Sequence, residues 1–106
     1  MSASRKPRTE RRADARSAAK DIKVRERIAR LEPGGAPDRP LEIVSASLVE
    51  PKARALPCAV CGANARVEDH TAKTIDGVAL RLAHVLCPAC GYARPVYFVI
   101  RPALAN

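Results

Sequence analysis

Aromatic residues are scarce in this chain of 106 residues, which contains one Phe, two Tyr and no Trp. Large aliphatic side chains are few as well, because Ala supplies 20 of the 50 hydrophobic residues. Leu, Ile, Val and Phe together number 23, and 18 of them lie between Leu41 and Ile100. A chain this short buries a modest share of its surface and often needs a covalent or metal cross-link to fold stably. The composition therefore excludes a large enzyme with a deep apolar pocket.

Long apolar runs are absent too. No uncharged apolar stretch reaches the length of about 18 residues that marks a membrane span. The first twenty residues lack the apolar segment of a secretory signal, and Glu10 and Asp14 disfavour an organelle-targeting peptide. We therefore expect a cytoplasmic protein with no membrane partner. Thiols stay reduced in that compartment, so the four cysteines are not expected to form disulfides.

Positive charge and secondary-structure breakers divide the chain into three stretches. Residues 1–32 hold 11 basic and 5 acidic side chains. Residues 33–40 form a linker of Pro, Gly and polar residues that cannot continue a helix. Residues 41–106 contain most of the β-branched residues and all four cysteines. The net charge of +8 is therefore concentrated in the first stretch, and it favours anionic partners such as nucleic acid or an acidic protein.

The first stretch is predicted to be a basic, partly helical arm. Its helix runs from Thr9 to Glu32, and Pro33 prevents it from continuing. At 100° per residue, six basic side chains fall within one sector about 80° wide. We call this set the basic stripe: Arg12, Arg16, Lys20, Lys23, Arg27 and Arg30. Two interpretations stay open, a solvated and partly disordered arm that keeps the protein soluble, or an arm that becomes ordered on a phosphate backbone.

The third stretch has the pattern of short strands. Leu41–Val49 is rich in β-formers and predicts one strand, and Pro95–Ile100 predicts the last. Asp76-Gly77 is the dipeptide of a type I′ turn and predicts a hairpin between strands 66–75 and 78–86. We therefore expect a small β-rich domain of three to four antiparallel strands.

A two-residue turn also fixes which residues of the hairpin face one another. The predicted cross-strand pairs are Val67–Leu86, Asp69–His84, Thr71–Leu82 and Ile75–Val78.

The most specific pattern is a pair of motifs, Cys58-Ala59-Val60-Cys61-Gly62 and Cys87-Pro88-Ala89-Cys90-Gly91. Two residues between cysteines allow a tight turn to point both sulfurs at one position, and two such turns provide the four ligands of a tetrahedral ion. Glycine after each second cysteine permits a positive φ, so that backbone N–H groups can turn toward the thiolates. The predicted hairpin lies between the motifs and brings them together.

These motifs and their flanking strands resemble the zinc ribbon, a class of small domains with two Cys-x-x-Cys-Gly turns joined by a β-hairpin. The resemblance covers about half of the chain. It implies that one structural Zn²⁺ is bound by Cys58, Cys61, Cys87 and Cys90. Zinc ribbons are common in transcription, translation and RNA-processing proteins, where they bind nucleic acid or a partner subunit, and others are purely structural.

Other chemistries fit the sequence less well. The second motif also resembles half of a rubredoxin-type iron site, and four thiolates suit iron as well as zinc. That family packs aromatic residues around its metal and is usually acidic, whereas this chain is basic and poor in aromatics. The sequence shows no nucleophile matched to His70 or His84 and no phosphate-binding glycine loop. We expect no catalysis and no small-molecule substrate.

Two functions from different classes remain. The basic stripe predicts binding to RNA, DNA or a ribosome- or polymerase-bound complex, with weak sequence specificity because phosphate contacts carry little sequence information. The alternative is an adaptor that docks on an acidic protein. The aromatic residues Tyr92, Tyr97 and Phe98, near Arg81, Arg94 and Arg101, are candidates for a base-stacking surface, although core filling is the favoured role for so few aromatics.

Overall fold

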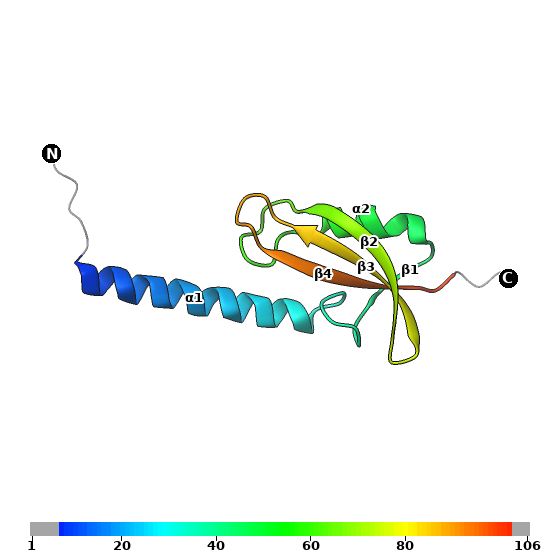
Figure 1. Cartoon of the computed structure of the whole chain (residues 1–106), viewed down its shortest axis with the longest axis horizontal. Coiled ribbons are helices and arrows are strands. Elements are labelled where there is room, and N and C mark those ends of the chain that lie inside the picture. Colours follow the sequence, from blue (N-terminus) through cyan, green and yellow to red (C-terminus); the bar gives the residue numbers. More distant parts are fainter. Residues whose placement is uncertain (1–6, 103–106) are drawn as a thin grey trace.

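A four-stranded sheet with two α-helices forms the described part of the chain, residues 7–102 of the computed structural model (Figure 1). The first six residues of the predicted arm 1–32 and the last four of the predicted domain 41–106 lie outside it. The elements, in chain order, are α1 Arg8–Leu31, β1 Leu41–Ile43, the 3₁₀ helix η1 Ala46–Leu48, α2 Val49–Ala55, β2 Arg66–Ile75, β3 Val78–Leu86 and β4 Ala93–Ile100. None of the helices in residues 7–102 is long and apolar enough to cross a bilayer.

The sheet is mixed, with strand order β1-β4-β3-β2. The pairs β2–β3 and β3–β4 are antiparallel, as predicted, but β1 runs parallel to β4. The expectation of a purely antiparallel sheet was therefore wrong. After β1 the chain crosses one face of the sheet through α2 before it enters β2 at the opposite edge, so β1 can pair only with β4. Beyond the strand, the backbone N–H of Arg101 donates to the carbonyl of Ile43 at 2.8 Å.

The strand predicted over Leu41–Val49 is only three residues long, and the chain then becomes helical. Ser45 caps η1, because its hydroxyl accepts a hydrogen bond from the Ser47 N–H at 3.3 Å. Pro51 lies in the first turn of α2, where a missing N–H costs no helical hydrogen bond. The cap at Ser45, the position of Pro51 and the burial of Val49 against the sheet together outweigh the β propensity of the segment.

The β2–β3 hairpin follows the predicted register over most of its length. The pairs Asp69–His84, Thr71–Leu82 and Ile75–Val78 are confirmed, and Asp76 and Gly77 both have positive φ, as a type I′ turn requires. A bulge between Val67 and Asp69 shifts the end of the strand, so Val67 pairs with Val85 and the predicted Val67–Leu86 pair was wrong. The extra residue there is Glu68, whose carboxylate forms an ion pair with Arg66 at 2.9 Å.

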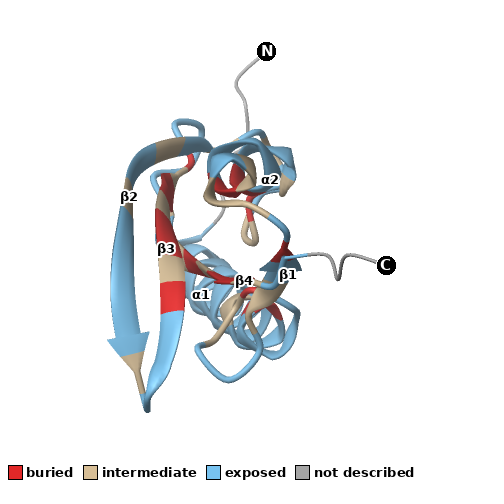
Figure 2. Cartoon of the chain, turned by 90° about the vertical axis from the view of Figure 1, so that its right-hand side faces the viewer, coloured by how far each residue is buried: buried red, intermediate tan, exposed pale blue. Residues whose placement is uncertain are grey.

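The core lies between one face of the sheet and α2 (Figure 2). Val96 and Phe98 of β4 are almost fully buried, and they pack with Val49 and Ala53 from α2 and with Ile43 from β1. Phe98 is therefore the aromatic that fills the core. A smaller cluster of Leu80, Leu82 and Val99 lies on the opposite face, where Tyr97 packs against it. The core is small, and the buried Cys58 and Cys87 lie at its margin, where they line a small cavity with Leu56 and Val85.

Helix α1 projects away from the sheet, and only its last turns contact the rest of the molecule (Figure 1). It spans Arg8–Leu31, against a predicted 9–32, and its N-cap is Pro7, which makes no side-chain cap. Ala29 is its one buried residue among those described. Residues 33–40 hold this end of α1 on the sheet, because the carbonyl of Gly34 accepts a hydrogen bond from the Tyr97 N–H at 2.8 Å. Gly34 has a φ of +85° and is closely packed, so a side chain there would collide with Leu41.

Candidate metal centre

Two turns with the same backbone geometry carry the cysteines. The first knuckle, residues 58–62, follows α2, and the second knuckle, residues 87–91, joins β3 to β4. In each knuckle the N–H of the glycine donates to the carbonyl of the first cysteine, at 2.9 Å from Gly62 and 2.7 Å from Gly91. The N–H of the first cysteine donates in turn to the carbonyl five residues later in both knuckles. Both glycines have positive φ, as the sequence indicated.

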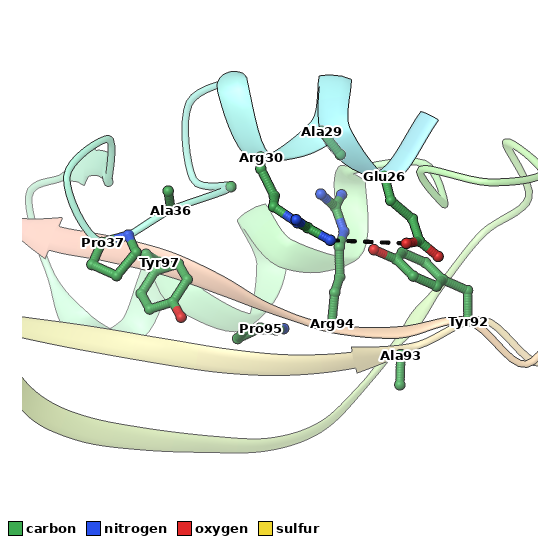
Figure 3. A pocket seen from close by; sticks show the side chains of 11 residues that line it. Glu26, Ala29, Arg30, Ala36, Pro37, Tyr92, Ala93, Arg94, Pro95 and Tyr97 are labelled. Carbon is green, nitrogen blue, oxygen red and sulfur yellow. Dashed lines mark ion pairs between the residues drawn. The ribbon is translucent and has the colours of Figure 1, made fainter. Parts of the chain in front are cut away.

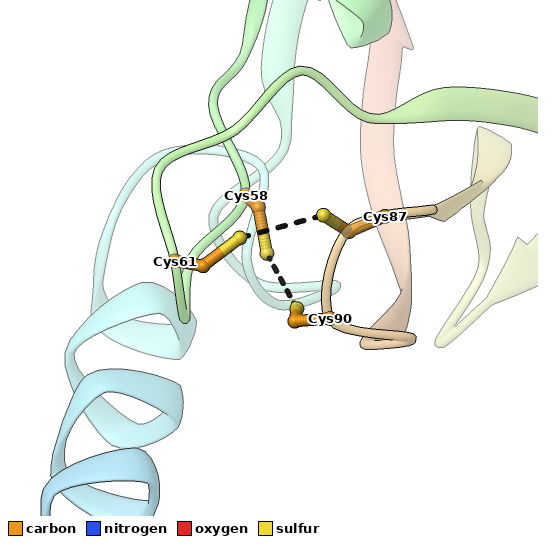
Figure 4. Close-up of side chains that lie close together, drawn as sticks. All are labelled: Cys58, Cys61, Cys87 and Cys90. Carbon is orange, nitrogen blue, oxygen red and sulfur yellow. Dashed lines mark hydrogen bonds between the residues drawn. The ribbon is translucent and has the colours of Figure 1, made fainter.

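The knuckles bring all four sulfurs to one place (Figure 4). Each sulfur lies within 4.8 Å of the other three. The closest contacts cross between the knuckles, at 3.6 Å from Cys58 to Cys90 and 3.5 Å from Cys61 to Cys87. The cysteines are free thiols, with no disulfide among them. A tetrahedral ion with Zn–S bonds of about 2.3 Å sets its sulfurs about 3.8 Å apart, so the spacing fits such an ion. The cluster is therefore a candidate four-cysteine metal site.

Burial divides the site into an inner and an outer half. Cys58 and Cys87, the first cysteine of each knuckle, are buried, whereas Cys61 and Cys90 are exposed. The N–H of Val60 points at the Cys58 sulfur, at 3.4 Å, and supplies one of the donors that stabilise a thiolate. Four sulfur donors close the coordination of a tetrahedral ion and leave no position for a substrate. The arrangement therefore suits a structural metal, and its donors suit zinc or iron.

The hydrogen bonds at Cys58 favour its thiolate. Burial raises the pKa of this thiol. The backbone N–H groups of Cys61 and Val60 and two neighbouring thiols together have a larger, opposite effect, and the pKa falls to about 7.

The outer cysteines behave in the opposite way. The backbone at Tyr92 lowers the pKa of Cys90, but burial and the other three thiols raise it, to about 12. At Cys61 a backbone hydrogen bond at Ala63 also lowers the pKa. Cys87, desolvation and Cys58 raise it by more, so the pKa of Cys61 is raised overall. Once one thiolate is present, its charge opposes the next ionisation. Full ionisation of the cluster therefore needs a cation at its centre.

The basic stripe lies on the exposed surface of α1. All six of its side chains are exposed, from Arg12 near the start of the helix to Arg30 in its last turn. Arg30 also forms an ion pair with Glu26, at 3.9 Å. The residue that faces the sheet is Ala29, which lies about 100° around the helix from Arg30. The stripe therefore faces solvent, and it lies away from the cysteine cluster.

One contact that the sequence did not reveal ties α1 to the metal site. Arg25 lies outside the stripe, and its guanidinium donates to the carbonyl of Val60, in the first knuckle, at 2.6 Å. The two residues are 35 positions apart, and no local sequence pattern signals such a bond. The position of the helix is thus linked to the conformation of the first knuckle.

The two histidines lie apart from the ligand set. His84 on β3 is hydrogen-bonded through its Nδ1 to the Oδ1 of Asp69 across the hairpin, as the predicted register implied, and both side chains are partly exposed. His70 is half-buried on β2, with its Nε2 unpaired among the described residues. Neither belongs to the group of side chains that could hold the metal.

Comparison with known proteins gives no relative for this arrangement: no family model matches the chain, and neither a curated protein nor a solved structure matches it. The interpretation of the site therefore depends on its own geometry.

Replacing Cys87 by Ser tests the ligand set. The buried sulfur is one of four donors, so we expect the variant to lose most of its bound metal and its cooperative thermal transition, because a structural site contributes about 10–16 kcal/mol to folding. Elemental analysis and calorimetry measure both. His70→Gln is the control, and it should keep one metal per chain. A Cys87→Ser protein with full metal content and an unchanged transition would contradict the four-cysteine site.

The pKa values predict how metal affinity depends on pH. Cys61 and Cys90 hold their protons at neutral pH, so a metal must displace those protons when it binds. Affinity for zinc should therefore rise as the pH is raised from 6 to 8, and proton release should accompany binding. Competition with a chromophoric chelator and calorimetry in buffers of different ionisation enthalpy measure these effects. The same affinity at both pH values would show that the thiols are already ionised without metal.

Proposed function

We propose that this protein binds nucleic acid through α1, on a domain stabilised by one structural Zn²⁺ at Cys58, Cys61, Cys87 and Cys90, and that it has no catalytic role. The metal supplies a cross-link between the two knuckles. The four-sulfur set supports this assignment, because it is closed to substrate and its spacing fits a tetrahedral ion.

The observation that carries the nucleic-acid proposal is the basic stripe on an exposed and anchored helix. Its six cationic side chains repeat from Arg12 to Arg30, a length of about 27 Å along the helix, and duplex DNA carries about one charge per 1.7 Å over such a length. Arg25 and the Gly34–Tyr97 hydrogen bond hold the end of that helix against the domain. The stripe can therefore contact several phosphates at once while the metal-bound domain fixes its orientation.

A specific feature favours the alternative, an adaptor on an acidic protein. Val24, Ile28 and Leu31 form an apolar row along α1 and are 48%, 51% and 59% exposed. A helix that carries such a row beside basic residues suits a groove with an apolar floor and an acidic rim.

An iron electron carrier has no comparable support. The colour of the purified protein separates the two metals, because the iron form is red and the zinc form colourless.

Neutralising the outer half of the stripe tests the proposal. The triple variant Arg12→Gln, Arg16→Gln, Lys20→Gln should bind a DNA duplex more weakly. The negative slope of log affinity against log salt should become shallower by about 0.9 for each phosphate that the variant no longer neutralises. Fluorescence anisotropy at several salt concentrations measures it. The matched control Lys52→Gln, Arg54→Gln, Lys73→Gln removes as much charge from exposed positions outside α1 and should keep the slope. Equal slopes for all three proteins, or binding that ignores salt, would favour the adaptor.

A further inference from the structure

A cleft separates the last turns of α1 from the start of β4 (Figure 3). Its volume is about 440 Å³, within the range of about 300–1,000 Å³ of sites that hold small organic ligands. Side chains of α1 form one wall, and residues 92–97 form the other, with residues 35–37 of the linker closing one end. No cysteine lines the cleft, although Tyr92 and Arg94 also line a small cavity beside Cys58 and Cys87. The polar residues of the cleft are Glu26, Arg30, Tyr92, Arg94 and Tyr97.

The charge of the cleft favours an anion. Arg30 and Glu26 neutralise one another in their ion pair. Arg94 extends from β4 toward α1, and its guanidinium forms no hydrogen bond or ion pair with any other residue in the described range 7–102 (Figure 3). This side chain is half-buried, so its cation lacks both a protein partner and full hydration. A phosphate supplies the acceptor that such a guanidinium lacks, in a geometry that arginine matches with two parallel hydrogen bonds.

The cleft also contains both tyrosines of the chain, Tyr92 and Tyr97. The sequence favoured core filling for the aromatic residues, and Phe98 takes that role, whereas both tyrosines are half-buried on the cleft wall and Tyr97 also packs against the smaller apolar cluster. Aromatic rings beside arginines are the surface on which proteins stack unpaired bases.

The cleft is continuous with the basic stripe, because Arg30 is both the last member of the stripe and a lining residue of the cleft. We propose that the cleft binds one unpaired nucleotide of a single-stranded nucleic acid, with its base on Tyr92 and its phosphate on Arg94. This proposal rests on the proposed function. A strand that follows the stripe along α1 reaches the cleft at the end of the helix. A base paired within a duplex cannot enter, so the cleft confers a preference for single strands.

The test compares a labelled 12-nucleotide single strand with a duplex of the same length, using the full-length, metal-loaded protein and fluorescence anisotropy. Arg94→Gln and Tyr92→Leu should each weaken single-strand binding about 10-fold, within the range measured for base–aromatic stacking, and should leave duplex binding unchanged. Tyr92→Phe keeps the ring and should keep most of the affinity. Arg54→Gln removes an equal charge from exposed α2 and should bind both forms as the unaltered protein does.

A second measurement does not depend on the folding of any variant. A single strand that carries 5-iodouracil should cross-link to Tyr92 of the unaltered protein on irradiation, and mass spectrometry of the digested product identifies the residue. Cross-links confined to α1, or equal losses of single-strand and duplex binding in Arg94→Gln, would overturn the cleft while leaving nucleic-acid binding by the stripe intact. Absence of binding to either form at low salt would refute the proposed function itself, and the cleft proposal with it.

Discussion

The convergence of four cysteine sulfurs on one point is the constraint on which the rest of this structure depends. The apolar core lies under α2, and Cys58 and Cys87 are buried at its margin, where they line a small cavity with Leu56 and Val85. Four thiolates held together repel one another, so without a cation the thiols of Cys61 and Cys90 keep their protons. A divalent ion removes that repulsion and joins the end of α2 to the turn between β3 and β4. In a small domain a cross-link of this kind replaces the interior that the composition does not supply.

The same constraint extends to α1 through few contacts. Arg25 binds the carbonyl of Val60, a residue between the two cysteines of the first knuckle, and Gly34 pairs with β4. A helix with one buried residue in its described length gains little from packing, so these hydrogen bonds carry much of its positioning. Disorder of the first knuckle therefore removes one of the two hydrogen bonds that position the helix. On this basis the cysteine cluster, the exposed stripe and the cleft beside Tyr92 form one linked arrangement, in which a metal bound at the cluster would fix the direction of the cationic surface.

Sequence patterns predicted the features whose causes are local. The two Cys-x-x-Cys-Gly motifs dictate two equal turns, and Asp76-Gly77 dictates the hairpin, since in both cases the backbone conformation depends on residues next to one another. The register was wrong only beyond the bulge at Glu68, because an extra residue in one strand leaves no local signal. The segment predicted as a strand over Leu41–Val49 leaves the sheet after Ile43 and becomes helical from Ala46. There the outcome depended on burial against a sheet whose strands come later in the chain. The Arg25–Val60 bond and the cleft were missed for the same reason, because their residues meet only in the folded chain.

The most direct test of this dependence is a metal titration of the chelated protein, followed by hydrogen exchange. A metal-clamped fold predicts that the backbone amides of both knuckles and of β4 exchange rapidly after chelation, and that protection returns in proportion to added zinc and saturates at one ion per chain. If those amides stay fully protected in excess chelator, with no ion detected by elemental analysis, the fold does not need the metal and its central interaction is a different one.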